Sequence, residues 1–452
     1  MVIGMRFRRH PSYWYMHMEL VDDASSRRLL QFVNRNHQLL NIILRNNIHL
    51  LESSFSLLIT VPRLRHYLHF DIKRAYFRLK LKQMRQQTSR SLSGNSLRVN
   101  VNRASVMEDS FNQLRYKTAD EMRRRLSVTF NGEDGIDAGG LTREWFSVIA
   151  RDLFNPNYAL FSPTIDQVTF QPNPHSSVNP DHLQYLKFVG RVIGKAICDG
   201  QLMDAHFTRS FYKHILGQQV TYHDLEVIEP DYYNSLRQIL ELPLDMLGLD
   251  LTFSMESREF DHTRVVDLVP GGRDIPVTDE NKIEYVQLVA RHRMVVAIRD
   301  QVDSFLVGLH DLVPAELISL FDAHELELLI SGLPNVDVDD LRANTEYYGY
   351  KVTDQQIEFF WRILQGFSKE EKALFLQFVT GTSKVPLEGF QALQGADGTK
   401  KFNIQKAYGA HLLPSAHTCF NQLDLPDYTS EEEMREKLLI AIREGSEGFG
   451  FA

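Results

Sequence analysis

Cys419 is the residue of this chain best suited to chemistry, and it is one of only 2 cysteines among 452 residues. A proline-containing loop leads into it, and the polar pair His417 and Thr418 stands directly before it. The thiolate form of cysteine is a nucleophile, and a nearby imidazole raises the thiolate fraction of a thiol whose unperturbed pKa is about 8.5. This setting favours nucleophilic chemistry, although an ordinary loop cysteine ahead of a strand would show the same pattern.

The second cysteine, Cys198, provides a contrast, because it follows an apolar helical stripe over residues 188–197. A cysteine among aliphatic residues packs as a small apolar side chain, so we assign Cys198 to a helix core. Two cysteines cannot build a disulfide framework. A reducing compartment, the cytoplasm or the nucleus, is therefore expected.

Other uses of the thiol fit the sequence less well. A papain-like protease has a histidine well downstream of its cysteine, and no histidine follows Cys419. A zinc site built from His411, His417 and Cys419 lacks a fourth ligand. The glycine-rich stretch 131–140 lacks both the ligands of a calcium loop and the ending of a phosphate loop, so its glycines are expected to form turns. We expect no metal and no cofactor.

The residues after Cys419 predict the elements that position it. Residues 420–425 alternate as a strand does, and Pro426 ends the pattern. Ser430 and Glu433 then predict a capping box for a helix that runs to about residue 444. Cys419 is therefore expected on a loop that leads into a strand.

Upstream, a polar stretch divides the chain. Residues 86–96 are predicted to be a linker, residues 25–85 predict two or three helices, and residues 1–24 are left unassigned. Beyond the linker, strand patterns at 97–101 and 126–130 flank a helical stretch. A new domain is therefore expected to begin near residue 97.

Charge is unevenly distributed. Residues 1–100 carry 17 of the 50 basic side chains but only 5 of the 58 acidic ones. A basic arm suits RNA or an acidic partner, and a helical segment with solvated basic faces has the same composition. The acidic remainder argues against nucleic acid as the main ligand, and polar residues interrupt the apolar run at 37–61 too often for a membrane span.

Several motifs together resemble the HECT family of ubiquitin ligases. They are the stretches 139–145 (GGLTREW), 188–191 (FVGR), 327–332 (ELLISG), 376–386 (LQFVTGTSKVP) and 413–421 (LPSAHTCFN). Their order and spacing match the family from about residue 97 to the end. Residues 1–30 match nothing, so two interpretations stay open: the chain is the C-terminal end of a much longer protein, or a gene model that starts late.

The resemblance implies an α+β fold with two lobes and a ubiquitin-ligase activity. Cys419 corresponds to the family's catalytic cysteine, which takes ubiquitin from a conjugating enzyme as a glycyl thioester and passes it to a lysine of a protein substrate. The implied organisation is an N-lobe at 97–346 with a small subdomain at about 228–300, a hinge at 347–352 around Gly349, and a C-lobe at 353–452.

The resemblance also implies roles for other residues. His417 and Thr418 match the motif beside the nucleophile, where they would orient groups and stabilise charge, although a purely loop-shaping role stays open. Asp424 would either orient the incoming lysine or solvate the end of a strand. Phe449, on the glycine-flanked tail, corresponds to an aromatic anchor that aligns the lobes during transfer.

Two surfaces are implied less directly. The conjugating enzyme would dock on Leu247, Leu249, Leu251 and Phe253, and a second ubiquitin would bind noncovalently at Tyr158, Leu160 and Phe161. Core packing would explain the same apolar residues. The competing function is a non-catalytic HECT-like module that recruits partners through its basic N-terminal helices. The presence of Cys419 and Phe449 favours the enzyme.

Overall fold

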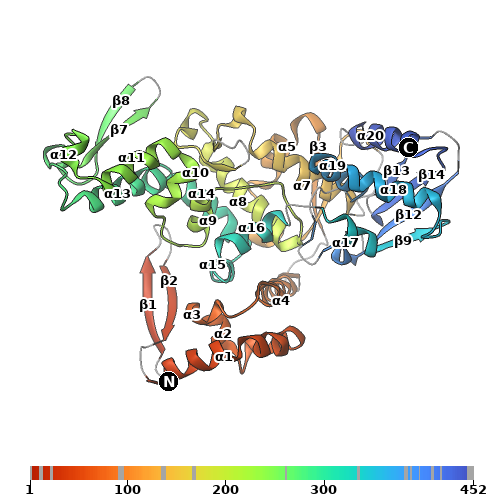
Figure 1. Ribbon diagram of the computed structural model, residues 1–452, viewed down its shortest axis with the longest axis horizontal. Helices are drawn as coiled ribbons and strands as arrows, with labels where there is room; N and C mark the ends of the chain where they lie inside the picture. The colour runs from red at the N-terminus through yellow and green to blue at the C-terminus, as the bar shows by residue number, and fades with distance from the viewer. Residues whose placement is uncertain are drawn as a thin grey trace. The chain divides into compact units, whose positions relative to one another are not determined.

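The structure, a computed structural model, combines helices with small sheets and confirms the α+β class (Figure 1). It describes residues 3–9, 14–20, 24–89, 96–133, 139–164, 169–259, 262–332, 336–380, 385–386, 389–395, 398–408, 412–417 and 420–444. Unit 1 comprises Met1–Arg90, Phe154–Gly194 and His206–Leu326, and unit 2 comprises Ser91–Leu153, Lys195–Ala205 and Glu327–Ala452. Unit 2 thus combines segments from both sides of the predicted hinge.

Unit 1 begins with a hairpin followed by helices. Strands β1 (Ile3–Arg9) and β2 (Trp14–Leu20) pair antiparallel in the segment that the sequence left unassigned. The helices that follow are α1 (Ala24–Asn46), α2 (Ser56–Thr60), α3 (Pro62–Arg65) and α4 (Phe70–Ser89). Helix therefore continues to Ser89, into the stretch that was expected to be a linker.

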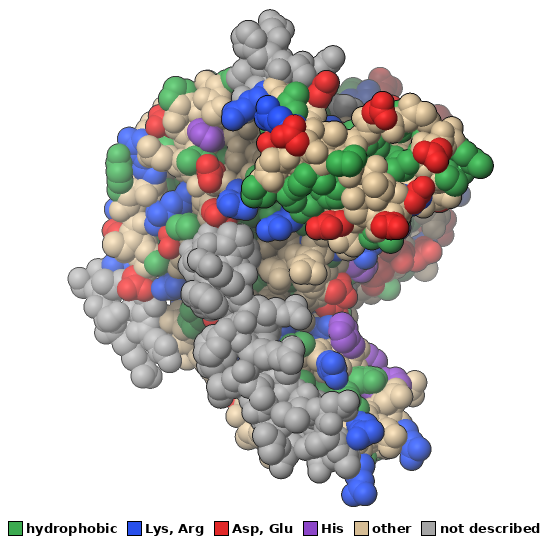
Figure 2. All heavy atoms as spheres, turned by 90° about the vertical axis from the view of Figure 1, so that its left-hand side faces the viewer, with side chains coloured by type: hydrophobic (Ala, Val, Ile, Leu, Met, Phe, Trp, Pro, Cys, Tyr) green, Lys and Arg blue, Asp and Glu red, His purple; other side chains and the backbone are tan. Residues whose placement is uncertain are grey.

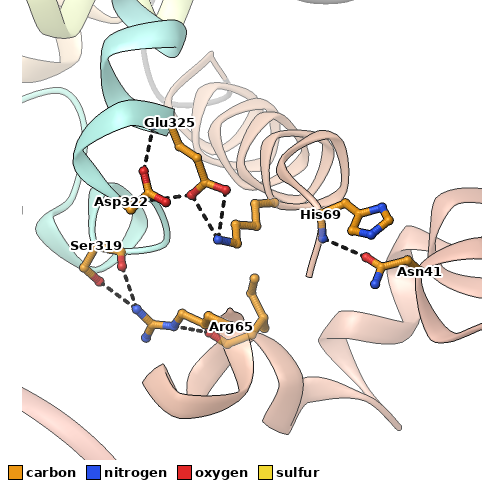
Figure 3. A network of polar contacts seen from close by, with 8 residues as sticks. Asn41, Arg65, His69, Ser319, Asp322 and Glu325 are labelled. Atoms are coloured by element: carbon orange, nitrogen blue, oxygen red, sulfur yellow. Dashed lines mark hydrogen bonds and ion pairs between the residues drawn. The ribbon is translucent and has the colours of Figure 1, made fainter. Parts of the chain in front are cut away.

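Buried polar contacts attach these helices to the rest of unit 1 (Figure 3). The Lys73 ammonium on α4 lies 2.9 Å from the carboxylate of Glu325 in α16 (Ala323–Ser331), and only 5% and 12% of the two side chains are exposed. Arg65 donates a 2.7 Å hydrogen bond to the carbonyl of Ser319, just after α15 (Ala315–Ile318). Removing one partner of a buried ion pair typically costs about 3 kcal/mol, because the other charge stays buried. The helices are therefore an integral part of unit 1.

A crossing of two helices forms the centre of unit 1. Helices α8 (His182–Asp199) and α14 (Arg299–His310) approach so closely that a Cβ at Gly190 would clash with the carbonyl of Phe305, and one at Gly308 with that of Lys187. Glycine permits this backbone contact, which explains the glycine of the 188–191 motif. Nearby elements of unit 1 are η3 (Pro156–Tyr158), β5 (Phe161–Pro163), β6 (Phe170–Pro172) and α9 (Arg209–Ile215).

The small subdomain of unit 1 has its own apolar core. It contains α10 (Leu225–Ile228), α11 (Pro230–Glu241), α12 (Leu244–Leu247), the hairpin β7 (Ser254–Glu259) and β8 (His262–Asp267), and α13 (Lys282–Arg291). A π-helical turn, His292–Val296, follows α13. None of the described helices combines the length and apolar character needed to cross a bilayer.

The first part of unit 2 is a parallel strand pair covered by helices. Strand β3 (Ser96–Val101) pairs with β4 (Arg125–Phe130). Helices α5 (Val106–Leu114) and α6 (Ala119–Met122) connect the two strands in the chain, and α7 (Gly140–Leu153) follows β4. Trp145 of α7 is 1% exposed and donates a 2.8 Å hydrogen bond to Ser110 of α5. This contact fixes α7 within unit 2.

The second part of unit 2 is a four-stranded sheet in the order β13, β14, β12, β9. The strands are β9 (Thr345–Tyr348), β12 (Phe402–Ala407), β13 (Ser415–His417) and β14 (Gln422–Pro426). The other elements are α17 (Val338–Ala343), α18 (Gln355–Gly366), α19 (Lys369–Thr380), β10 (Gln394–Gly395), β11 (Gly398–Thr399) and α20 (Glu431–Glu444). The backbone of Glu433 donates to the hydroxyl of Ser430 at 3.2 Å, as the predicted cap requires, and the Glu433 carboxylate accepts a hydrogen bond from the backbone of Thr429 at 3.0 Å.

Candidate active site

The candidate nucleophile lies in the connection between two paired strands. Cys419 and Thr418 lie outside the described residues, whereas His417 and Phe420 on either side of them are described. The flanking strands β13 and β14 run antiparallel, with His417 opposite Gln422. The sheet therefore fixes both ends of the short segment that carries the thiol.

His417 is held by a carboxylate on the neighbouring strand. Its Nε2 lies 3.0 Å from Oδ2 of Asp424, and the other carboxylate oxygen accepts a 2.7 Å hydrogen bond from Gln422. The His417 side chain is 54% exposed, whereas that of Asp424 is 19% exposed. Because a carboxylate accepts hydrogen bonds, Nε2 carries a proton, and Nδ1 of a neutral ring is left as an acceptor.

Neither role considered for Asp424 from the sequence included this contact. The antiparallel register places Asp424 diagonally across from His417, at a separation that long side chains span. The two residues are seven positions apart in the chain, so a correct strand register would have revealed the pair. The structure therefore adds Asp424 to the site as a partner of His417.

Asn421 fixes the other end of the segment. It is 0% exposed and has a φ of +49°, in the left-handed region that asparagine tolerates better than most residues. Its Nδ2 donates to the carbonyl of Lys400 at 2.7 Å, and its own carbonyl accepts from the backbone of Asn403 at 2.9 Å. The Asn403 side chain also donates to the carbonyl of Phe420 at 2.9 Å. The chain directly after Cys419 is thus held by both backbone and side-chain contacts.

A further partner of Asn421 comes from a distant part of unit 2. Arg143 of α7 donates from Nη1 to Oδ1 of Asn421 at 3.1 Å, although the two residues are 278 positions apart. Arg143 is 5% exposed, and its Nε donates to the carbonyl of Gly139 at 3.3 Å. Both residues belong to motifs singled out in the sequence, but no local signal linked one motif to the other.

Exposed apolar side chains precede strands β13 and β14 in the chain. They are Tyr408, Leu412, Leu413 and Phe420, which are 86%, 54%, 41% and 53% exposed. The carbonyl of Leu412 accepts a 2.7 Å hydrogen bond from the Tyr428 hydroxyl, so this part of the loop is anchored to the fold. Exposed apolar side chains of this kind are typical of a surface that receives a macromolecular partner.

The predicted hinge begins within the sheet. Tyr347 and Tyr348 belong to β9, where they pair with Ile404 and Gln405 of β12. Gly349 follows with a φ of +79°, and a Cβ there would lie 2.9 Å from the Cβ of Lys406. The backbone at position 349 therefore requires glycine. Whether this residue permits lobe rotation stays a prediction.

Tyr350, on the far side of Gly349, is also fixed. Its hydroxyl donates to the carbonyl of Leu425 and approaches the carboxylate of Asp427, both at 2.9 Å. Burial and the neighbouring Asp427 carboxylate raise the pKa of the Tyr350 phenol, which keeps it in the donor form. Among the predicted hinge residues just named, Gly349 therefore remains the best candidate for a pivot.

The predicted docking residues differ in exposure. Phe253 is 4% exposed within the core of the small subdomain, and Leu247 and Leu251 pack partly against that core. Leu249 is 47% exposed. The structure therefore leaves Leu249 as the best placed of the four for contact with a partner.

The residues predicted to bind a second ubiquitin are mostly internal. Leu160 and Phe161 are 0% and 5% exposed, and Phe161 packs against the rings of Phe154 and Phe207. Tyr158 is partly buried, with its ring 5.7 Å from that of Tyr185. Of the three residues, Tyr158 is therefore the best placed to contact a second ubiquitin, and this contact stays a prediction. The proposed anchor, Phe449, lies outside the described residues.

Comparison with known proteins identifies relatives of the chain. A family model described as HECT-domain (ubiquitin-transferase) matches residues 147–452. The chain is 54% identical over 93% of its length to E3 ubiquitin-protein ligase UPL2 of Arabidopsis thaliana. It is 49% identical over 99% of its length to E3 ubiquitin-protein ligase HUWE1 of Mus musculus, and 45% identical over 98% to E3 ubiquitin-protein ligase TOM1 of Saccharomyces cerevisiae. The chain spans only 10% to 14% of the length of these relatives.

Proposed function

This chain belongs to the HECT family of ubiquitin transferases, and from that membership we propose that it is a ubiquitin-protein ligase. It would accept ubiquitin from a conjugating enzyme on Cys419 and transfer it to lysines of protein substrates. The observation that carries the proposal is the family match, which covers residues 147–452 and so includes Cys419. The fixed residues on both sides of Cys419 support it, because a nucleophile needs a defined position.

The first step exchanges one thioester for another. The Cys419 thiolate attacks the carbonyl that joins the last glycine of ubiquitin to the conjugating enzyme. A carbon–sulfur bond forms to Cys419, the bond to the conjugating enzyme breaks, and that enzyme's cysteine leaves as a thiolate. Because the bonds exchanged are alike, the protein mainly has to supply positioning and a thiolate.

The second step moves ubiquitin to an amine. A neutral lysine attacks the thioester carbonyl, a carbon–nitrogen bond forms, and the Cys419 thiolate leaves. The nitrogen then gives up a proton to water or a nearby base. We assign His417 an orienting and charge-stabilising role. Its contact with Asp424 supports this role, since a carboxylate partner fixes the orientation of the ring.

We propose that the conjugating enzyme docks on the small subdomain, near Leu249. Figure 2 views the molecule from the side on which that subdomain lies and shows apolar side chains gathered among acidic ones. Exposed apolar residues of the subdomain include Leu242, Met246, Leu249, Ile275 and Ile283, and exposed acidic residues nearby in the chain are Glu241, Asp245 and Asp250. Such a surface suits a partner with apolar and basic side chains.

Replacing Leu249 with aspartate is therefore expected to weaken docking. The apparent affinity for the charged conjugating enzyme should fall about tenfold, equivalent to about 1.4 kcal/mol. Loading rates measured over a range of conjugating-enzyme concentrations would show this as a higher half-saturating concentration. Discharge of protein that is already loaded should be unchanged. Equal effects on loading and discharge would contradict a docking role.

We also propose that Gly349 is the pivot that lets the thiol turn from the donor to the substrate. Gly349→Ala should lower the free energy of unfolding by about 1–2 kcal/mol. The φ at this position is positive, and the added Cβ would lie 2.9 Å from the Cβ of Lys406. Thermal unfolding would measure this loss, and single-turnover loading and discharge should both slow. Gly366→Ala is the matched control, since a Cβ there meets nothing within 4 Å. Unchanged rates in Gly349→Ala would leave that residue a purely structural role.

The decisive experiment for the proposed function is a thioester assay. The chain is mixed with ubiquitin, an activating enzyme and a panel of charged conjugating enzymes, and adducts are resolved with and without reductant. We expect a ubiquitin adduct that reductant removes. No adduct with any conjugating enzyme would favour the binding-module alternative. We further propose a reducing location, cytoplasm or nucleus, which cell fractionation would test.

A further inference from the structure

Asn421, two residues after Cys419, accepts a hydrogen bond from a side chain outside its own sheet, that of Arg143. We propose that Arg143 is a positioning residue for the Cys419 thioester and that it acts through Asn421. This inference rests on the proposed function. It concerns transfer to the lysine rather than acceptance of ubiquitin.

Asn421 is held at three of its polar groups. Its carbonyl accepts from Asn403, its Nδ2 donates to Lys400, and its Oδ1 accepts from Arg143. Two of these partners lie close by in the same sheet region, but the guanidinium comes from α7. A hydrogen bond from a cation is about twice as strong as a neutral one, and burial strengthens it further. Arg143 therefore contributes strongly to the position of Asn421, two residues from the thiol.

Arg143 itself stands on a rigid support. Arg143 is 5% exposed, and its guanidinium also donates to the carbonyl of Gly139. Helix α7 is anchored by the Trp145 hydrogen bond to Ser110, and Phe146 is 1% exposed. A positioning group needs this kind of support, because a loosely held donor would not define a geometry.

The contact joins segments from the two predicted lobes. Arg143 belongs to the segment expected in the N-lobe, and Asn421 to the segment expected in the C-lobe, yet both lie in the same compact unit here. The hydrogen bond forms only while α7 lies against the sheet. The position of Asn421 is thereby linked to this arrangement of the two segments.

Discharge should depend on this link more than loading does. During loading, a docked conjugating enzyme brings its own thioester and helps to define the geometry. A lysine that attacks the Cys419 thioester has no such support, so the loop must present the carbonyl in a productive orientation while the carbon–sulfur bond breaks and the thiolate leaves. A misplacement of about 1 Å can cost about 100-fold in rate.

The test uses two variants that remove opposite sides of the contact. Arg143→Gln removes the cation, and Asn421→Gly removes the amide while tolerating the positive φ. The chain is loaded, loading is quenched, and discharge to free lysine is followed over a range of lysine concentrations. We expect the rate at saturating lysine to fall about tenfold in each variant, with the half-saturating lysine concentration and the loading rate within about twofold of the parent.

The double variant and the controls separate positioning from folding. The double variant should discharge no more slowly than the single variants, because both remove the same contact. Arg143→Lys should recover part of the rate. Arg151→Gln changes an exposed arginine of the same helix and should match the parent. Rates are counted per molecule of loaded protein, so loss of folded protein does not enter them.

Defects that multiply in the double variant would overturn the inference, and so would unchanged discharge in either single variant. Equal slowing of loading and discharge would also overturn it, since that result indicates general damage to the site. Failure of the proposed function would look different. The parent itself would then carry no reductant-sensitive adduct, and both proposals would fall together.

Discussion

Cys419→Ala is expected to abolish ubiquitin transfer by this chain. Without the sulfur no thioester forms, and the residual rate should fall by at least about 1,000-fold, toward the direct reaction between the charged conjugating enzyme and lysine. The measurement is a substrate or self-modification assay, run beside the thioester assay. Both the adduct and the modified products should disappear. Product formation at the parent rate would show that the reading of Cys419 as an acyl acceptor is wrong.

Cys198→Ala is the matched control for this experiment. Cys198 is partly buried near the end of α8, where a small apolar residue replaces it with little change in volume. We expect the adduct and the products to form at about the parent rate. An adduct lost in Cys198→Ala but kept in Cys419→Ala would move the acceptor role to the other cysteine.

Phe449→Ala should separate the two steps of the reaction. An apolar aromatic between Gly448 and Gly450 can reach an apolar surface at little steric cost, and the family resemblance implies that it aligns the lobes during transfer. Loading should stay within about twofold of the parent, while discharge to lysine should fall about tenfold or more. Single-turnover experiments that follow each step separately would measure this difference.

The sequence offers a control for that tail residue. Phe451 lies two positions further on, so Phe451→Ala removes an equally large aromatic without touching position 449. It should load and discharge as the parent does. Equal defects in both steps for Phe449→Ala, or the same discharge defect in Phe451→Ala, would refute a specific anchor at position 449.

The variants at Arg143 and Asn421 can be compared with the other variants by the step of the reaction that each one slows. Cys419→Ala should remove both steps, Leu249→Asp should affect loading, and Phe449→Ala and Arg143→Gln should affect discharge. Their defects therefore assign residues to steps of one reaction. Loading that survives in Arg143→Gln also shows that the altered chain is folded.

Much of the candidate site was predictable from the sequence because its signals are local. Cys419 stands in a nine-residue motif, and the strand after it alternates with a period of two, as half-buried strands do. Strand β14 and helix α20 formed close to where these patterns predicted them. The α+β class followed from the family resemblance.

Exposure was harder to predict, because an apolar residue type does not say which side chains face a core. Phe253, Leu160 and Phe161 were expected to be contact residues, yet all three are nearly fully buried. Leu249, with the same apolar character, is exposed. Burial depends on which other side chains pack against a residue. In the small subdomain the side chains that pack together come from several separate helices.

By itself, then, the sequence determined the family, the candidate nucleophile and the elements on either side of it, since each depends on residues close together in the chain. Only the tertiary structure revealed the partners of those elements. The pairing of His417 with Asp424 requires a strand register, and the hydrogen bond from Arg143 to Asn421 joins residues 278 positions apart. A hydrogen bond needs two groups within about 3 Å, and periodicity within one segment carries no information about which distant segment supplies the second group.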